Sequence, residues 1–175
     1  MSVTLELDPV LEDNKRCLAQ AIELVSGLAP ELYAAPCEIA FGASIGGHLR
    51  HNIDHYVSFL RQLGHGRVDY DQRGREARLE MDPRLASERL REILRSLEDL
   101  VVRPDQRIEV RMDCGGSRAW GGSTARRELM FLFSHSVHHY AIIAMMCRHN
   151  GHDVPRGFGV APSTLKYQEA QAGCE

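Results

Sequence analysis

The stretch ELMFLFSHSVHHYAIIAMMCRHN, residues Glu128–Asn150, decides the fold that we expect for this chain. Its apolar residues recur three and four positions apart, which predicts one long helix with an apolar face. His135 and His139 lie on that same face, one helical turn apart. Because residues at i and i+4 are neighbours on a helix, their two imidazoles can converge on one metal ion.

A second histidine-rich stretch, SIGGHLRHNIDHY, spans Ser44–Tyr56. Its apolar residues form another helical stripe, and His48, His51 and His55 follow one edge of that stripe. Seven of the nine histidines of the chain fall in these two stretches. The sequence therefore predicts two helices that carry most of the metal-binding side chains.

The composition is that of an ordinary globular protein, with 175 residues, 43% hydrophobic and 26% charged. We expect a single domain over residues 1–175. The formal net charge of −3 gives no basic surplus that would attract nucleic acid or anionic lipid. The five cysteines are widely spaced and form no CxxC pair, which predicts a reduced protein. The sequence shows no secretory signal, which predicts a cytoplasmic location. No uninterrupted apolar run reaches roughly 18 residues, so we expect no membrane span.

Helix start and stop signals divide the chain into four long helices, which favours an all-α, four-helix bundle. The expected helices run from Asp8-Pro9 to about Gly27, from Ser44 to Gly64, from Asp82-Pro83 to about Leu100, and from Ser123 or Thr124 to Gly151. The prolines, glycine and mixed polarity of 31–43 indicate a connector with at most one short helical turn. We interpret the polar span 67–81 as an exposed loop and the long connection between the second and third helices.

Two other segments have weaker patterns. Residues 107–112 alternate charged with apolar side chains, which is compatible with a strand and a small β-hairpin before the last long helix. The tail 153–167 contains two prolines, and we interpret it as an ordered coil that packs over one end of the bundle.

Two imidazoles on an apolar face have two explanations. Burying both without partners costs about 1–3 kcal/mol each, so a sequence that keeps them there favours a bound metal. Alternatively, His135 and His139 are satisfied by backbone carbonyls or water, or face a solvent-filled groove.

The two stretches together, SIGGHLRHNIDHY and REL…FLFSHSVHHYAII, resemble the DinB/YfiT-like superfamily. The closing FGVAPSTLKY is also similar to the C-terminal segment of a DinB-like branch. This resemblance implies a four-helix bundle that holds a divalent metal with three histidines, one from the second helix and two from an HxxxH pair on the fourth. His135 and His139 match the pair, and His51 is the first choice on the second helix, with His48 and His55 as alternatives.

The resemblance implies two classes of function. Three imidazoles leave an open coordination position, which is typical of a catalytic site, and the ion would be zinc, nickel, iron or manganese. The first hypothesis is therefore a metal-dependent enzyme acting on a small molecule, such as a transferase of a low-molecular-weight thiol, or a related hydrolase or isomerase. The second is a metal- or ligand-binding bundle with a stress-response role and no turnover.

Several neighbouring residues are weaker candidates. Asp54, Tyr56, Glu128 and Tyr140 are candidates to orient a ligand or accept hydrogen bonds from the histidines, although most acidic residues on helices are solvated. Arg126 and Arg127 are candidates for binding an anion at the start of the last long helix, although surface charge is the commoner role. We expect His138 to be a packing or hydrogen-bonding histidine and Cys147 to be a packing thiol. Homodimers are common among such bundles, so a homodimer is compatible with this sequence.

Overall fold

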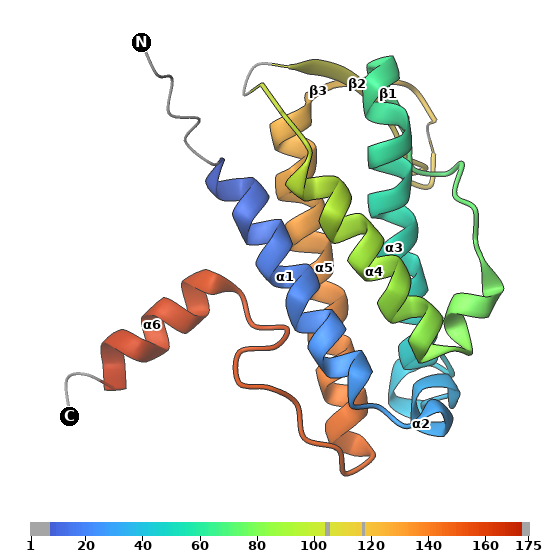
Figure 1. Ribbon diagram of the computed structural model, residues 1–175, viewed down its shortest axis with the longest axis vertical. Coiled ribbons are helices and arrows are strands. Elements are labelled where there is room, and N and C mark those ends of the chain that lie inside the picture. Colours follow the sequence, from blue (N-terminus) through green and yellow to red (C-terminus); the bar gives the residue numbers. More distant parts are fainter. Residues whose placement is uncertain (1–7, 104–105, 117, 173–175) are drawn as a thin grey trace.

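The computed structural model describes residues 8–103, 106–116 and 118–172, which form a mostly helical structure with a small sheet at one end (Figure 1). Four long helices pack together: α1 (Pro9–Ser26), α3 (Ile45–Gln62), α4 (Pro83–Glu98) and α5 (Ala125–His149). Two shorter helices are α2 (Pro30–Ala34) and α6 (Pro162–Ala172), and three 3-10 turns are η1 (Glu38–Ala40), η2 (Leu63–His65) and η3 (Ala77–Glu80). The described residues thus contain six α-helices where the sequence predicted four.

The long helices begin at side chains that cap their first amides. The Oδ1 of Asp8 accepts a hydrogen bond from Val10 N at 2.9 Å, and the Oγ of Ser44 accepts one from Gly47 N at 2.9 Å. Asp82 caps α4, and the Oγ1 of Thr124 caps α5. Each such bond satisfies a backbone amide that has no partner within the helix, so these residues fix where the helices start.

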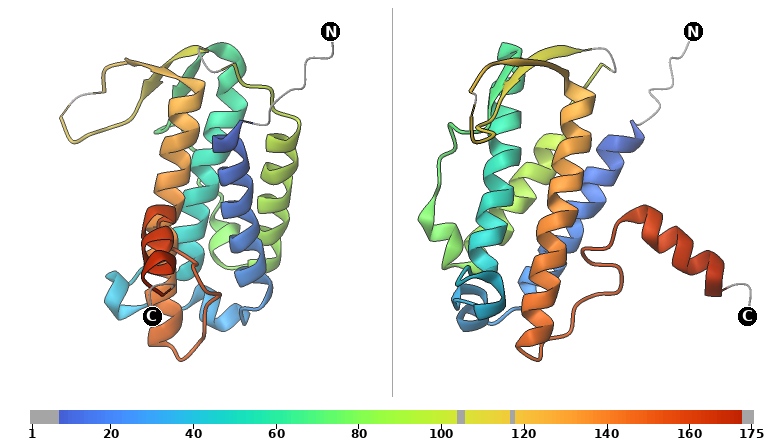
Figure 2. Two further views of the ribbon diagram at one scale, coloured as in Figure 1. Left: turned by 90° about the vertical axis from the view of Figure 1, so that its left-hand side faces the viewer. Right: turned by 180° about the vertical axis from the view of Figure 1, so that it is seen from behind.

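The arrangement of the long helices places α3 and α5 next to one another. Helix α1 packs against α4 and α5, and α3 packs against α5 and α4 (Figure 2). Their apolar faces meet in one core, whose fully buried side chains include Tyr33, Ile53, Phe59, Leu90 and Leu129. The two helices that carry the histidine-rich stretches are therefore in direct contact.

The span 67–81 is not an exposed loop, and that prediction was wrong. Strand β1 (Arg67–Asp69) pairs in parallel with β2 (Arg107–Arg111), and β2 pairs antiparallel with β3 (Gly121–Thr124). The predicted hairpin is therefore present as β2 and β3, but it is part of a three-stranded sheet. Val68 and Leu79 are buried, and the buried Asp69 is paired with Arg111.

The tail also differs from its prediction, because it contains a helix. The segment after α5 runs back along the bundle, where the ring of Phe158 stacks on Tyr140 with 4.8 Å between ring centroids. Gly159, with φ of +72°, approaches the backbone of Ala141 so closely that a Cβ would lie 2.4 Å from its amide nitrogen. Helix α6 then projects away from the bundle and has no buried residue (Figures 1 and 2).

Helix α5 is long and apolar enough, by length and composition, to cross a membrane. The core helix of a soluble protein passes the same test, and α5 packs against α1 and α3. The prediction that this chain does not span a membrane thus stays a prediction.

Candidate metal centre

The contact between α3 and α5 brings the predicted ligands into one cluster. Ring centroids of His51 and His135 lie 5.0 Å apart, those of His51 and His139 lie 4.8 Å apart, and those of His135 and His139 lie 4.5 Å apart. The two alternatives on α3 join the same cluster, since His55 is 4.4 Å from His135 and His48 is 5.2 Å from His139. We refer to these five residues as the histidine cluster.

The positions of the ring nitrogens single out three members of the cluster. His51, His55 and His135 each offer one nitrogen, and these three atoms lie within 4.8 Å of one another. The Nδ1 of His139 instead lies 2.9 Å from the Nδ1 of His48, a hydrogen bond in which one imidazole donates to the other. The predicted set of His51, His135 and His139, with His48 or His55 as alternatives to His51, stays a prediction beside this group.

The three nitrogens have the chemistry that a metal ion needs. The Nδ1 of His55 lies 2.8 Å from the backbone oxygen of His51, so this nitrogen is the donor and the lone pair is on Nε2. The Nε2 of His135 is buried and has no hydrogen-bond partner within the described ranges. Metal–nitrogen bonds of about 2.1 Å place ligand nitrogens roughly 3–3.5 Å apart, so side-chain movements of about an ångström would complete a site.

Burial keeps these imidazoles neutral, as metal ligation requires. Desolvation, with a smaller contribution from neighbouring histidines, lowers the pKa of His51 to about 2 and that of His135 to about 4. Desolvation also lowers the pKa of His55 to about 4 and that of His139 to about 3. At neutral pH each of these side chains therefore has a lone pair that is free for an ion or a hydrogen bond.

One side of the cluster opens on a pocket of about 570 Å³. His48, His51 and His139 line it, and the rest of the lining comes from Ala34, Pro36, Gly42, Ala43, Ser44, Gly47, Arg50, Glu80 and Met81. This volume is within the range of small-molecule sites in proteins. The pocket combines an apolar side with polar groups near the cluster.

Two ion pairs fix the position of the charged residues that line the pocket. The guanidinium of Arg50 binds Asp54 at 2.8 Å and Glu80 at 2.6 Å, which links α3 to η3. Asp54 is buried, and desolvation raises its pKa, partly offset by Arg50. Asp54 therefore orients Arg50 at the pocket, and its contact with the cluster is indirect.

Sequence reasoning missed Arg73 and Tyr70, because both lie in the span interpreted as an exposed loop. Tyr70 stacks on the ring of His55 with centroids 5.5 Å apart, and its hydroxyl donates to the buried Glu128 at 2.9 Å. Arg73 points its Nη1 into the cluster, 3.2 Å from the Nδ1 of His51. Neither residue has a local sequence signal, since both positions depend on how β1 is paired.

The weaker candidates have structural roles. The hydroxyl of Tyr56 donates to Asn14 at 2.7 Å in the core, and Tyr140 is the partner of Phe158. Arg126 forms an ion pair with Asp8 at 3.3 Å. Burial raises the pKa of Cys147 to about 11, which agrees with the expected packing thiol.

His138 lies on the exposed side of α5, with its ring 5.2 Å from that of His139. A packing role for His138 therefore finds no burial to support it, and a hydrogen-bonding role stays a prediction.

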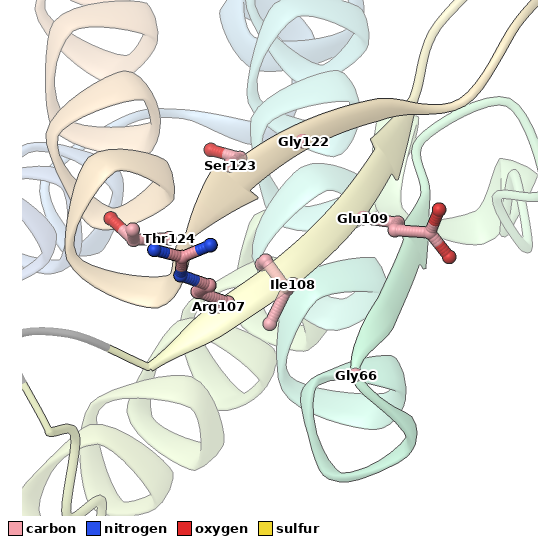
Figure 3. A pocket seen from close by; sticks show the side chains of 7 residues that line it. All are labelled: Gly66, Arg107, Ile108, Glu109, Gly122, Ser123 and Thr124. Atoms are coloured by element: carbon pink, nitrogen blue, oxygen red, sulfur yellow. The ribbon is translucent and has the colours of Figure 1, made fainter.

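A second hollow, of about 550 Å³, lies on the sheet and is lined by none of the histidines. It is bounded by Gly66, Arg107, Ile108, Glu109, Gly122, Ser123 and Thr124 (Figure 3). Arg107 and Thr124 lie on one side of it, and the Glu109 carboxylate points away from them. This hollow has no group of metal ligands, and we do not assign it a role.

Comparisons with known proteins agree with the sequence resemblance. The pattern of the DinB family matches residues 1–164. A curated protein, FK506-binding protein 5 of Rhizopus delemar, is 32% identical over 108 residues. That match covers 59% of this chain and 28% of the fungal protein, so the chain spans under a third of its relative.

Proposed function

This chain belongs to the DinB family. We propose that it binds one divalent transition metal through three residues of the histidine cluster. We further propose that it acts on a small molecule in the adjoining pocket. The observation that carries the proposal is the group of nitrogens from His51, His55 and His135, all within 4.8 Å of one another. An acceptor that is buried without a partner, such as the Nε2 of His135, is costly unless something binds it.

The proposed reaction is a transfer involving a small molecule such as a low-molecular-weight thiol, or a related hydrolysis or isomerisation. A bound zinc, nickel, iron or manganese ion would supply Lewis acidity, which stabilises a thiolate or lowers the pKa of a bound water. His48 and His139 line the pocket as a hydrogen-bonded pair, and a neutral imidazole there can accept a proton from the bound molecule. Arg50 and Glu80 offer polar contacts that would orient it.

A second function, metal or ligand binding without turnover in a stress response, is favoured by one observation. The Nη1 of Arg73 lies 3.2 Å from the Nε2 of His55, so a side chain already contacts the nitrogens that would hold the ion. A site that is closed in this way fits storage or sensing better than turnover. A screen of metal-loaded protein for thiol consumption separates the two functions. An enzyme would consume thiol, and the His48→Gln variant would consume it more slowly. A binding protein without turnover would consume none.

The metal site itself is tested by measuring metal content. Wild-type protein, His135→Ala and His149→Ala would be stripped with chelator, offered zinc, nickel and manganese in turn, and analysed for bound metal. His149 is a matched control, because it is an exposed histidine at the end of the same helix. We expect about one equivalent in wild type and in His149→Ala, and loss of a ligand should weaken binding by 10-fold or more, on the order of 1.4 kcal/mol per factor of ten.

A bound ion also stabilises the folded state by mass action, so about 2.7 kcal/mol is expected at a metal concentration near 100 times the dissociation constant. Thermal unfolding with and without metal therefore provides a second readout. If wild type retains no metal and gains no stability from any of the three ions, the proposal is wrong and the histidines are structural or pocket groups.

Cytoplasmic location, a homodimer, and the absence of nucleic-acid and membrane partners stay predictions from the sequence. They are compatible with this proposal and add no support to it.

A further inference from the structure

The guanidinium of Arg73 lies against two of the three histidines of the proposed metal site, His51 and His55. Its Nη1 is 3.2 Å from the Nδ1 of His51, 3.2 Å from the Nε2 of His55 and 3.4 Å from the Nδ1 of His55. Because the Nδ1 of His55 already bonds the backbone oxygen of His51, the guanidinium donates to the lone pair on Nε2. That lone pair is the one that His55 would give to an ion.

A guanidinium and a divalent cation exclude one another at these nitrogens. A neutral imidazole has one nitrogen with an available lone pair, which either accepts a hydrogen bond or forms a coordinate bond. Both groups are also positively charged, and like charges repel strongly in a partly desolvated site. Arginine keeps its proton at any physiological pH, so it cannot lose its charge to accommodate the ion.

The segment that carries Arg73 is anchored at both ends, its second residue Asp71 pairs with Arg118 at 3.6 Å, and Arg73 holds its middle to the cluster. We call residues 70–76, between β1 and η3, the strap. Its first residue is anchored by the hydrogen bond from Tyr70 to Glu128 at 2.9 Å, and its last by the ion pair of Glu76 with Arg89 at 3.2 Å. Between these anchors Gln72, Gly74 and Arg75 are exposed.

The inserted side chain is also incompletely satisfied. The Nε of Arg73 is buried and lacks a hydrogen-bond partner in the described part of the chain. A buried donor without a partner carries a desolvation penalty that is relieved when the side chain returns to water. The strap is therefore built so that Arg73 can leave the cluster without unpairing β1 or moving η3.

We propose that Arg73 competes with the metal ion for His51 and His55, so that metal binding expels this side chain and loosens the strap. The inference rests on the proposed metal site and adds a coupling between that site and a surface segment. The wild-type affinity for metal is then reduced by the free energy of removing Arg73, and the state of the strap reports whether the ion is bound.

The test compares Arg73→Gln with Arg75→Gln. Arg75 lies two residues further along the strap, is exposed, and has the same charge, so it controls for removing one positive charge. Zinc binding to chelator-stripped protein would be measured by calorimetry. Losing two hydrogen bonds and one like charge should tighten zinc binding by about tenfold or more in Arg73→Gln, and Arg75→Gln should stay within about twofold of wild type, as a screened surface charge.

Hydrogen exchange of the strap amides provides a readout that does not depend on affinity. Zinc should speed exchange at residues 71–76 in wild type and in Arg75→Gln. In Arg73→Gln exchange should already be fast before zinc is added. This measurement in wild type alone keeps the proposal testable if Arg73→Gln does not fold.

The possible results distinguish a failure of the competition by Arg73 from a failure of the metal site itself. If wild type and Arg73→Gln bind zinc with equal affinity, or if zinc slows exchange of the strap in wild type, competition by Arg73 is wrong and the metal site remains. Weaker binding by Arg73→Gln would likewise overturn the proposal, because Arg73 would then assist the ion. If none of the three proteins binds zinc, nickel or manganese, the metal site fails and this inference fails with it.

Discussion

Gly46, in the first turn of α3, allows η3 to pack against that helix and form one wall of the pocket. A Cβ at Gly46 would lie 2.1 Å from the backbone oxygen of Glu80 and 2.6 Å from Cε1 of Tyr33. Ordinary contacts of this kind are about 3.5–4 Å, so η3 would have to move by more than an ångström. The hydroxyl of Tyr33 bonds the backbone oxygen of Leu79 at 2.6 Å, and it would have to move with η3.

The Gly46→Ala change should therefore destabilise the protein. Replacing a helical glycine by alanine gains about 0.5–1 kcal/mol from backbone entropy and helix propensity. Overpacking of this kind typically costs about 1–3 kcal/mol, and the clash involves backbone and a buried ring, so we expect a value near the upper end. The net expectation is a loss of about 1–2 kcal/mol in the free energy of unfolding.

Gly47→Ala is the matched control, one residue further along the same turn. Its Cβ would meet only the Oγ of Ser44, at 3.3 Å, so most of the gain of about 0.5–1 kcal/mol should remain. Urea unfolding of chelator-stripped protein would measure both variants, and a slope of about 1–3 kcal/mol per molar puts their midpoints roughly 1 M apart. A Gly46→Ala protein as stable as Gly47→Ala would refute the packing of η3 on α3.

Two further predictions concern the buried polar groups beside the cluster. The pKa of His55 is lowered from 6.5 to about 4 by burial, so in chelator-stripped protein the unfolded chain binds a proton that the folded protein does not. Stability should fall as the pH drops from about 6.5 to 4, by up to about 1.4 kcal/mol per pH unit for this group; urea unfolding at pH 7 and pH 5 measures it, and equal values would contradict it. Tyr70→Phe leaves the buried Glu128 with Ser123 as its side-chain hydrogen-bond donor among the described residues, and it should cost about 1–3 kcal/mol in thermal unfolding. Tyr167→Phe, which is exposed, should change stability by less than about 0.5 kcal/mol.

The long helices could be predicted from the sequence because their signals are local. Asp8, Ser44 and Asp82 cap the helices that were predicted to start at these residues, and Thr124, one of the two predicted starts, caps α5. A cap involves residues two or three positions apart, so it does not depend on the rest of the fold. The pair His135 and His139 was predictable for the same reason, since its spacing within one helix fixes its geometry.

Strand β1 could not be predicted, because it depends on a distant partner. It has three residues, and its polar members are held by contacts far away in sequence, such as the pair of Asp69 with Arg111. No period can be detected over three residues, and parallel pairing leaves no turn signal between the strands. Arg73 reaches the cluster only because β1 places the strap there. The role of Arg73 therefore could not be predicted without predicting the strand.

Helix α6 is a different case, because a local signal for it was present. Pro162 stands at its first position, and residues 168–172 are mostly good helix formers. The segment has no apolar stripe, so its hydrophobic pattern does not indicate a helix. The lack of buried residues in α6 agrees with the absence of an apolar stripe in its sequence. Amphipathic patterning therefore predicts helices that pack against a core, and it misses helices that do not.

The choice of ligands on α3 was left open for a physical reason. His48, His51 and His55 share one edge of the helix, and its rotation about its own axis is set by packing against α5. In the structure that rotation divides the cluster: His48 and His139 face the pocket and bond one another, while His55 and His135 belong to the group of converging nitrogens. His51 belongs to the nitrogen group and also lines the pocket. The converging group and the first-choice predicted set both contain His51 and His135, so these two sets differ only in whether His55 or His139 is the third ligand. That difference decides how much of the ion faces the pocket, because His55 lies on the side closed by Tyr70 and Arg73 and His139 lies on the open side.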